Sequence, residues 1–512
     1  MTRRYYVTTP IYYVNGAPHI GHAYTSVAAD VIARFKRLAG FDVFFLTGTD
    51  EHGQKVEQAA QTAGVTPIEL ANRVAADFRD MYDKMAISYD DFIRTTQPRH
   101  AEGAAALWKK LEENGHIYLG AYEGWYALRD ECFYQEEELV TAADGTRTAP
   151  TGAPVEWVKE PSYFFRLSKF QDRLLELYET HPGFVEPAGR RNEVRSFVRG
   201  GLRDLSISRT SFNWGIPVPG DPKHVMYVWV DALANYLSAV GYPDEGAPRW
   251  DFWPANLHLV GKDILRFHAI YWPALLMGAG LPLPERVFSH GWWTIAGQKM
   301  SKSLGNVLDP RDLVAEFGLD PVRFFLMREM PFGGDSDINR KAIITRMNVE
   351  LANDLGNLAQ RTLSQIARNC AGLLPERATP TAEDTALLAQ ASLLPDLMHG
   401  QIDRQALTDA LEEVWKVIRA SNAYIDHQAP WALKKTDPQR MADVLRVLAD
   451  VLRTIATVLQ PYMPGSMDTM LTQLGVEATE RDFAALGTPL PAGRPLPAPK
   501  GIFPRFVEAE SQ

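Results

Sequence analysis

The beginning of the chain constrains its fold most strongly, because signals for a strand, a helix and a second strand follow in immediate succession. Residues 5–9 have the aromatic and β-branched character of a strand, and 10–22 form a loop with proline and glycine. Across 27–38 apolar side chains recur at helical spacing, and Gly40 ends the helix. The apolar run at 42–48 is typical of a strand buried on both faces. The segment predicts a β-α-β unit, and therefore an α/β fold with a parallel sheet.

The remaining residues divide into several modules, because 512 residues are too many for one hydrophobic core. Short aromatic strands and a turn-rich stretch interrupt the α/β rhythm after its first part, which indicates an insertion. Later the rhythm resumes, and it then gives way to helical periodicity typical of a bundle. The expected order is a first half of the α/β domain, 1–115; an insertion, 116–225; the second half, 226–290; a loop region, 291–345; a helical domain, 346–480; and a Pro/Gly-rich tail, 481–512.

Composition excludes several classes of protein. The two cysteines, Cys132 and Cys370, imply neither a disulfide framework nor a cysteine-rich zinc site. Polar residues interrupt the N-terminus before a signal-peptide core can form, and the sequence contains no apolar run of about 18 residues. We therefore expect a cytoplasmic protein without a membrane span. The net charge of -10 says little about nucleic acids, because phosphate contacts need only a local basic face.

The loop His19–His22 stands where the first strand ends and the first helix begins. Ligands of α/β proteins bind at the carboxyl ends of strands, and helix N-termini attract phosphate. Gly21 allows a nucleotide to approach the backbone, and the imidazoles of His19 and His22 can donate hydrogen bonds to phosphate oxygens. The alternative is a turn with two surface histidines, and on this loop alone the two interpretations are equally good.

A second loop, Lys299–Ser303, has glycines on both sides. Lys299 and Lys302 supply point charges and Ser301 a hydroxyl, which together suit a polyphosphate. Taken alone, such a loop is more often a solvated basic turn.

The two loops together resemble the paired HIGH and KMSKS signatures of the class I aminoacyl-tRNA synthetases. Further stretches are similar to the methionyl-tRNA synthetase family in particular, and the resemblance covers most of the chain: 7–22, 45–55, 227–236, 261–276 and 289–303. It implies a Rossmann-type catalytic domain, a connective insertion and a helical anticodon-binding domain. The implied reaction makes methionyl-adenylate from methionine and ATP, with Mg²⁺ arriving on the ATP, and then charges the terminal adenosine of initiator and elongator methionine tRNAs.

The resemblance also implies roles for individual residues. His19, Gly21, His22, Lys299, Ser301 and Lys302 would bind ATP, with the histidines and lysines catalytic, and Asp263 would contact its ribose. Asp50 would bind the ammonium group of methionine. The rest of its pocket would comprise Ile11, Tyr13, Trp229, Tyr236, His268 and Trp272. Aromatic rings suit a polarisable thioether, although the same aromatic residues would otherwise be interpreted as core. Leu233 stands where the family often has proline.

At the tRNA end, the resemblance assigns anticodon binding to Asn357, Arg361, Pro430 and Trp431. Unpaired bases stack on aromatic rings and are read by hydrogen bonds, so Trp431 and the Asn–Arg pair fit this task. The alternative is a surface pair beside a buried tryptophan. A further cluster either faces the acceptor stem or is a solvated helix face: Arg190, Arg191, Arg195, Arg199 and Arg203.

Two departures from relatives narrow the expectation. Many relatives bind zinc through paired cysteines in the insertion, but only Cys132 lies there, so no zinc is expected. Some relatives carry a C-terminal tRNA-binding module that makes them dimers; none follows here, so a monomer is expected. Rival interpretations are a class I synthetase for Leu, Ile, Val or Cys, and a catalytically inactive synthetase-like tRNA-binding protein. The short insertion and the complete motifs disfavour them.

Overall fold

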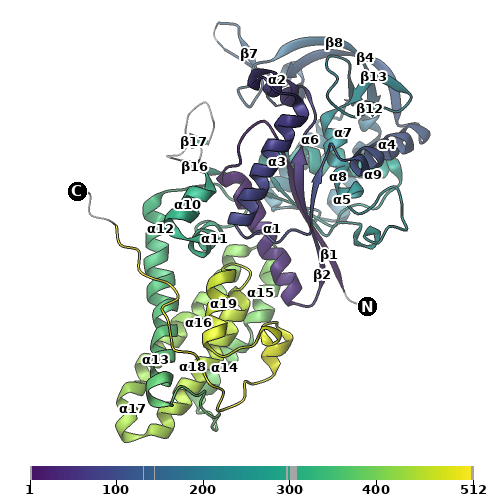
Figure 1. Ribbon diagram of the computed structural model, residues 1–512. Helices are drawn as coiled ribbons and strands as arrows, with labels where there is room; N and C mark the ends of the chain where they lie inside the picture. Colours follow the sequence, from purple (N-terminus) through teal and green to yellow (C-terminus); the bar gives the residue numbers. More distant parts are fainter. Residues whose placement is uncertain (1–2, 131, 143, 296–297, 300–307, 509–512) are drawn as a thin grey trace.

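A six-stranded sheet forms the centre of the larger, upper body in Figure 1. In this computed structural model residues 3–130, 132–142, 144–295, 298–299 (backbone) and 308–508 are described. Every neighbouring pair of strands in the sheet is parallel. The spatial order is β3 (Asp91–Arg94), β2 (Asp42–Asp50), β1 (Arg4–Tyr13), β14 (Leu257–Gly261), β15 (Val287–His290) and β9 (Val185–Glu186). The predicted α/β class with a parallel sheet is confirmed.

Strand β1 is longer than the sequence pattern indicates. It continues through the predicted loop to Tyr13, because Ile11 and Tyr13 still pair with Gly48 and Asp50 of β2. The register shifts between Thr8 and Ile11, a bulge around Pro10, which has no N–H to donate to a ladder. The proline that suggested the end of the strand therefore marks a bulge within it.

Helices cover both faces of the sheet, as a parallel sheet requires. Tyr5 and Val7 of β1 belong to the core that contains α1 (Ile20–Leu38) and α3 (Pro67–Lys84), whereas Tyr6 belongs to the core on the opposite face. That second core contains α4 (Pro98–Glu113), α7 (Val228–Leu233), α8 (Asn235–Ser238) and α9 (Trp272–Ala279). Alternate side chains of one strand thus anchor two layers of helices.

The middle of the chain forms a separate antiparallel unit above the sheet in Figure 1. Its longest strands, β4 (Ile117–Ala127) and β8 (Glu156–Phe165), pair with each other, and β5 (Cys132–Tyr134) and β10 (Leu205–Ser206) flank the pair. Its smaller elements are β6 (Val140–Thr141), β7 (Arg147–Thr148), β11 (Ser208–Arg209), β12 (Pro217–Val218) and β13 (Asp221–Met226). Between β8 and β10 the chain returns to the parallel sheet through α5 (Gln171–Thr180), β9 and α6 (Ala188–Arg199).

The lower body is helical, and α18 lies at its centre, packed against each neighbouring helix of the body. Before this body the chain forms β16 (Trp293–Ile295), β17 (Gln298–Lys299), α10 (Pro310–Phe317), α11 (Leu319–Arg328) and β18 (Ser336–Asp337). The body begins with a helical run of α12 (Arg340–Arg346), η7 (Met347–Gly356) and α13 (Asn357–Asn369). Its other helices are α14 (Ala382–Ser392), α15 (Leu394–Ile402), α16 (Leu407–Gln428), α17 (Pro430–Thr436), α18 (Pro438–Leu459) and α19 (Pro464–Gln473).

The C-terminal segment runs back along this helical body as an extended chain (Figure 1). Leu496 N–H donates to Gly372 O at 2.8 Å, and Phe506 N–H donates to Asn348 Oδ1 at 2.8 Å. Arg340 of α12 forms an ion pair with Glu508. Among the described residues, no helix is long and apolar enough to cross a membrane.

Candidate active site

A cavity of about 350 Å³ opens where four parallel strands end. Strand β1 lies between β2, its neighbour in sequence, and β14, so the order in which the strands are added along the sheet reverses there. Such switch points are the usual ligand sites of α/β proteins. The cavity lining includes ten of the residues singled out from the sequence: Ile11, Tyr13, His19, Gly21, His22, Asp50, Trp229, Tyr236, Asp263 and His268.

The two histidines of the first loop are held by the backbone of α1. The Nδ1 atom of His19, the N-cap residue, accepts from Gly21 N–H at 3.1 Å, and His22 Nδ1 accepts from His19 N–H at 3.1 Å. The rings stack with their centroids 3.8 Å apart. Because both Nδ1 atoms are acceptors, a neutral ring must carry its proton on Nε2. The helix start thus fixes two Nε2–H donors beside the cavity.

The opposite wall combines a carboxylate with aromatic rings. Asp50 is the last residue of β2 and pairs with Tyr13 across the ladder. Tyr13 contacts the edge of Trp229 at a centroid distance of 6.2 Å, and Trp229 stacks on Phe267 at 3.6 Å. A buried carboxylate next to an aromatic, apolar wall suits a ligand with an ammonium group and a polarisable side chain.

Tyr236 is oriented by a neutral histidine. Burial lowers the pKa of His268 to about 4. Its Nδ1 lies 3.0 Å from Ile264 O, which can only accept, so Nδ1 carries the proton and Nε2 accepts from Tyr236 O–H at 2.8 Å. Trp272 is fully buried behind this wall and is not part of the cavity lining. Its indole N–H donates to His258 Nε2 at 3.2 Å, so it supports Tyr236 from behind.

Three buried side chains that were not singled out from the sequence form a hydrogen-bonded network that holds α7, the helix that carries Trp229. The Asp231 carboxylate lies 2.6 Å from His52 Nδ1 and 2.7 Å from His100 Nε2. Burial by itself would raise the pKa of Asp231, but the two histidines lower it to about 2. Burial would lower the pKa of His52, yet the Asp231 carboxylate raises it above its ordinary value. The pair ties α7 to the segment that follows Asp50.

The nucleotide side contains further residues not singled out from the sequence. Thr25 of α1 donates to His290 Nε2 at 2.8 Å, since His290 Nδ1 donates to Gly291 O. Trp292 Nε1 donates to Asp263 Oδ1 at 3.3 Å. Lys299 lies in β17, whose backbone pairs with β16. The expected clamp residues Ser301 and Lys302 fall outside the described residues.

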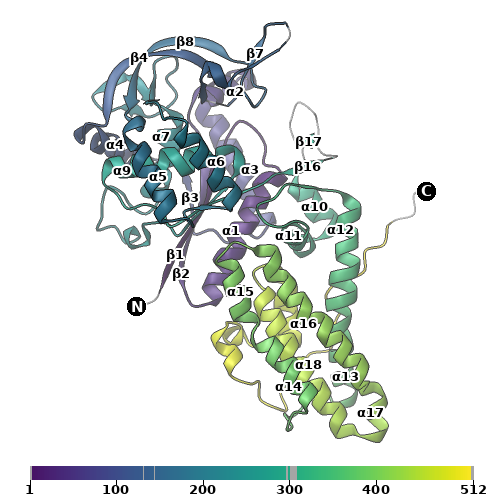
Figure 2. The same cartoon turned by 180° about the vertical axis from the view of Figure 1, so that it is seen from behind.

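The four residues expected at the tRNA end lie on α13 and α17, and α17 stands at the end of the helical body that is far from the sheet (Figures 1 and 2). Trp431 is 47% exposed, and the Arg361 guanidinium lies 5.1 Å from the centre of its ring. Asn357 is exposed one helical turn before Arg361. Pro430 begins α17 after Ala429, whose φ of 43° is unusual for a residue with a Cβ. The sharp turn presents the indole to solvent.

The arginines of the 190–203 stretch all have partners within the chain. Arg190 is 2.9 Å from Glu193, Arg195 and Arg199 are each 3.3 Å from Glu179, Arg191 bonds to Pro182 O, and Arg203 bonds to Gln135. Local acids therefore offset part of the charge on this face. In the described part of the chain, no cluster of three or more His, Cys, Asp or Glu side chains could hold a metal ion.

Comparison with known proteins agrees with this arrangement along the whole chain. The family model described as tRNA synthetases class I (M) matches residues 5–363. The model for the anticodon binding domain of methionyl tRNA ligase matches residues 374–512. The methionine–tRNA ligase of Brucella suis is 56% identical over 510 residues, which cover 99% of each chain. The chain belongs to the methionyl-tRNA synthetase family.

Other members of the methionyl-tRNA synthetase family are similar over the same length. The Rickettsia felis methionine–tRNA ligase is 55% identical over 99% of each chain. The Mycobacterium tuberculosis methionyl-tRNA synthetase in complex with methionyl-adenylate superposes with a TM-score of 0.96, 51% identity and coverage of 98% of this chain and 100% of that chain. The predicted family is therefore confirmed, and the Rossmann-like domain with a C-terminal helical domain is confirmed with it.

Some structural neighbours of the site could have been noticed in the sequence. His52 stands two residues after Asp50, and Asp231 stands two residues after Trp229, both in stretches that resemble the family. His290 likewise lies in a family-like stretch. An ionisable residue inside a stretch that resembles the family is the signal that these three share. His100 carries no such signal, because only the fold brings α4 beside α7.

Replacing Gly21 with alanine is expected to lower methionine-dependent ATP–pyrophosphate exchange by about 100-fold, the scale of a misplacement of about 1 Å at a reacting centre. A Cβ atom at Gly21 would lie 2.9 Å from Cε1 and 3.0 Å from Nδ1 of His19, so the ring must move. The matched control is Gly400→Ala in α15, where a Cβ would meet nothing within 4 Å. Exchange by Gly21→Ala at the unmodified rate would show that the position of His19 does not matter.

Proposed function

We propose that this chain activates L-methionine with ATP and transfers it to the 3′-terminal adenosine of methionine tRNAs. The observation that carries the proposal is the single cavity in which the HIGH histidines, Asp50 and the wall of Tyr13, Trp229 and Tyr236 meet. The family membership and the complex of the Mycobacterium tuberculosis relative with methionyl-adenylate support it. The relatives named above are methionine–tRNA ligases, which does not support the catalytically inactive alternative.

The proposed first step forms the adenylate by positioning and electrostatics. Asp50 binds the ammonium group of methionine, and the aromatic wall holds the thioether. A carboxylate oxygen of methionine attacks the α-phosphorus of ATP; a new P–O bond forms as the bond to pyrophosphate breaks. Charge that develops on the phosphates is stabilised by the Nε2–H donors of His19 and His22.

The remaining nucleotide contacts belong to the same proposal. Asp263 contacts the ribose, and Lys299, Ser301 and Lys302 bind the departing pyrophosphate. ATP would carry Mg²⁺ on its phosphates, where the ion would stabilise their negative charge. Ile11, His268 and Trp272 shape the methionine pocket, the last of them by supporting Tyr236.

In the second step the tRNA spans both bodies of the protein. A ribose hydroxyl of the terminal adenosine attacks the carbonyl carbon of the adenylate; the ester bond forms and AMP leaves. Trp431 stacks on an anticodon base, Asn357 and Arg361 hydrogen-bond to base edges, and Pro430 sets the turn. The substrates are initiator and elongator methionine tRNAs, and the protein works in the cytoplasm as a monomer.

The division of labour along the chain follows from this proposal. Segments 1–115 and 226–290 activate methionine, the insertion 116–225 connects them, and 291–345 carries the KMSKS loop. The helices of 346–480 bind the anticodon, and the tail 481–512 braces them.

The direct test is aminoacylation of purified initiator and elongator methionine tRNAs with labelled methionine and ATP. The proposal predicts that both tRNAs are charged and that a leucine tRNA is not. Adenylate formation without charging of either methionine tRNA would contradict the second step.

Zinc content gives a separate prediction. Cys132 is the single cysteine of the insertion, so four thiolate ligands cannot be assembled there. Purified protein is expected to contain less than about 0.1 zinc per chain, because a structural zinc would stay bound during purification in chelator-free buffer. Exchange activity is expected to survive chelation, because there is no structural zinc to remove. Stoichiometric zinc measured by metal analysis would refute this.

A further inference from the structure

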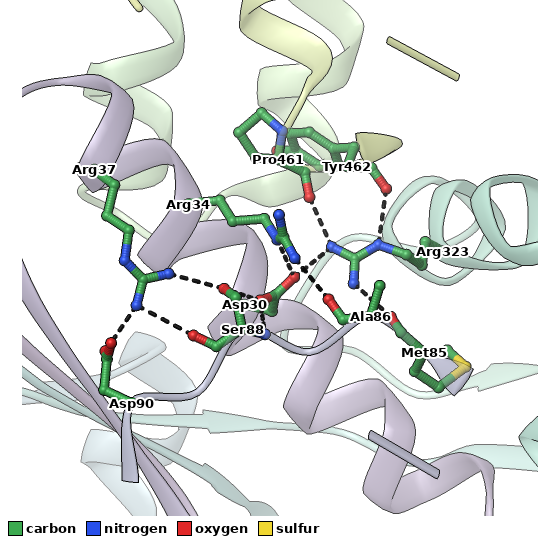
Figure 3. A network of polar contacts seen from close by, with 10 residues as sticks. All are labelled: Asp30, Arg34, Arg37, Met85, Ala86, Ser88, Asp90, Arg323, Pro461 and Tyr462. Atoms are coloured by element: carbon green, nitrogen blue, oxygen red, sulfur yellow. Dashed lines mark hydrogen bonds and ion pairs between the residues drawn. The ribbon is translucent and has the colours of Figure 1, made fainter. Parts of the chain in front are cut away.

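One fully buried guanidinium bonds to both bodies of the protein. Arg323 of α11 donates through Nη2 to Asp30 Oδ2 at 2.6 Å and to Pro461 O at 2.7 Å. Its Nε donates to Tyr462 O at 3.1 Å, and its Nη1 donates to Met85 O at 2.9 Å (Figure 3). Asp30 and Met85 belong to the synthetase segment, whereas Pro461 and Tyr462 belong to the anticodon-binding segment. One side chain thus joins the two.

The carboxylate that faces this guanidinium is itself fixed on the catalytic side. Asp30 accepts from Ser88 N–H at 2.7 Å, from Ser88 Oγ at 2.6 Å and from Arg34 Nε at 2.8 Å (Figure 3). Arg34 also donates to the carbonyl of Ala86, whose φ is 52°. Burial alone would raise the pKa of Asp30, but Arg323 and Arg34 hold it below its ordinary value. These contacts hold the Asp30 carboxylate, which binds Arg323, in one position and in its charged form.

Helix α1 connects this joint to the catalytic cavity. His19 and His22 stand at its N-terminus, and Asp30 lies in its middle. Its other end packs on the helical body: Phe483 N–H donates to Leu38 O at 3.3 Å. Figures 1 and 2 show α1 reaching from the sheet to the helices below. Because α1 carries the HIGH histidines, a rotation of the helical body about Arg323 would change the orientation of that body relative to these histidines.

The angle between the two bodies matters because the tRNA must reach both ends at once. The continuous helical run 340–369 is about 45 Å long at 1.5 Å per residue, so a rotation of about 5° would move its far end by about 4 Å. Misplacement of a reacting group by about 1 Å can cost about 100-fold in rate. A loose joint would leave anticodon binding intact but misplace the acceptor end.

We propose that Arg323 is a positioning residue for the tRNA-dependent step, which holds the anticodon-binding helices at one angle to the catalytic cavity. The inference rests on the proposed function. Arginine suits this place because its planar guanidinium carries five N–H donors, and four acceptors surround it here. Lysine would keep the charge beside Asp30 but could not reach acceptors on all sides.

The test compares Arg323→Lys with a matched variant, Arg446→Lys. Arg446 is also buried and also bonds to an aspartate and two carbonyls, but all its partners lie within the anticodon-binding segment: Asp450, Pro375 and Leu490. Each variant is assayed for ATP–pyrophosphate exchange without tRNA and for single-turnover transfer from preformed methionyl-adenylate to a full-length methionine tRNA. An acceptor-stem minihelix without an anticodon is the second transfer substrate.

For Arg323→Lys we expect exchange and minihelix transfer within about twofold of the unmodified chain, and transfer to full-length tRNA slowed by about tenfold or more. The tRNA concentration for half-maximal transfer should change by less than about twofold, because the anticodon contacts remain. Arg446→Lys should transfer to both substrates at near the unmodified rate. This split separates positioning from general loss of structure, which would slow both substrates together.

The inference is overturned if Arg323→Lys transfers to full-length tRNA normally, or if exchange and minihelix transfer fall equally. Should Arg323→Lys fail to fold, Asp320→Ala decides the question, since the Asp320 carboxylate accepts from Ser466 N–H across the same interface. A selective loss of about threefold for full-length tRNA is expected there, and no loss refutes the inference. Absence of methionine-dependent exchange in the unmodified chain would instead overturn the proposed function.

Discussion

Replacing Trp431 with alanine is expected to lower kcat/KM for tRNA aminoacylation by about 100-fold while leaving methionine-dependent pyrophosphate exchange within about twofold. Stacking of one base on an aromatic ring contributes about 1–3 kcal/mol, and each 1.4 kcal/mol is about tenfold. Trp431 is 47% exposed at the end of the helical body and has Arg361 beside its ring, so the indole is free to receive a base. Both rates are measured on the same preparation.

The control for this variant is Leu397→Ala. Leu397 of α15 is another large apolar side chain of the helical body and is 45% exposed, but α15 and α17 stand at opposite ends of that body (Figure 1). Its removal should change neither assay. Equal loss of exchange and aminoacylation in Trp431→Ala would show that the tryptophan is structural rather than a stacking platform.

Replacing Asp50 with asparagine is expected to raise KM for methionine in the exchange assay by about 10- to 100-fold. The carboxamide keeps the shape but loses the charge, and a hydrogen bond to a charged group is worth about 1.5–3 kcal/mol. The unmodified protein should also bind methionine far better than its analogue without the amino group. In Asp50→Asn this preference should largely disappear, which a competition assay with the analogue would measure.

Asp42 provides the control, because it stands exposed at the opposite end of the same strand. Asp42→Asn should leave KM for methionine unchanged. If Asp50→Asn kept both its affinity for methionine and its preference for the amino group, another residue would have to bind the ammonium.

Patterns local in the sequence were sufficient for the architecture. The apolar run that became β2 and the helical periodicity of α1 predicted the parallel sheet. Each of these patterns shows which side chains of a short segment face the core, and it can be recognised within that segment alone. The limit of β1 was misjudged at Pro10, since a proline in a bulge looks like a proline that ends a strand. The HIGH loop and Asp50 were predicted as neighbours in one site, and the cavity contains both. The roles of these residues remain predictions, which the variants above test.

Contacts that the fold alone creates could not be predicted. His100 and Asp231 are 131 residues apart, and Arg323 and Asp30 are 293 residues apart. In the sequence, Arg323 is one charged residue in an amphipathic helix, which normally indicates a solvated side chain. Trp272 shows the converse: the resemblance placed it in the methionine pocket, but only the packed structure reveals that it contacts Tyr236 and is not part of the cavity lining.

The central claim, activation of methionine in this cavity, is tested most directly by ATP–pyrophosphate exchange with each of the twenty amino acids, with Mg²⁺ and without tRNA. We expect exchange with methionine far above exchange with leucine, isoleucine, valine or cysteine. A preference for another amino acid would contradict the assignment of the pocket. No exchange with any of them in folded protein would contradict the adenylate chemistry itself.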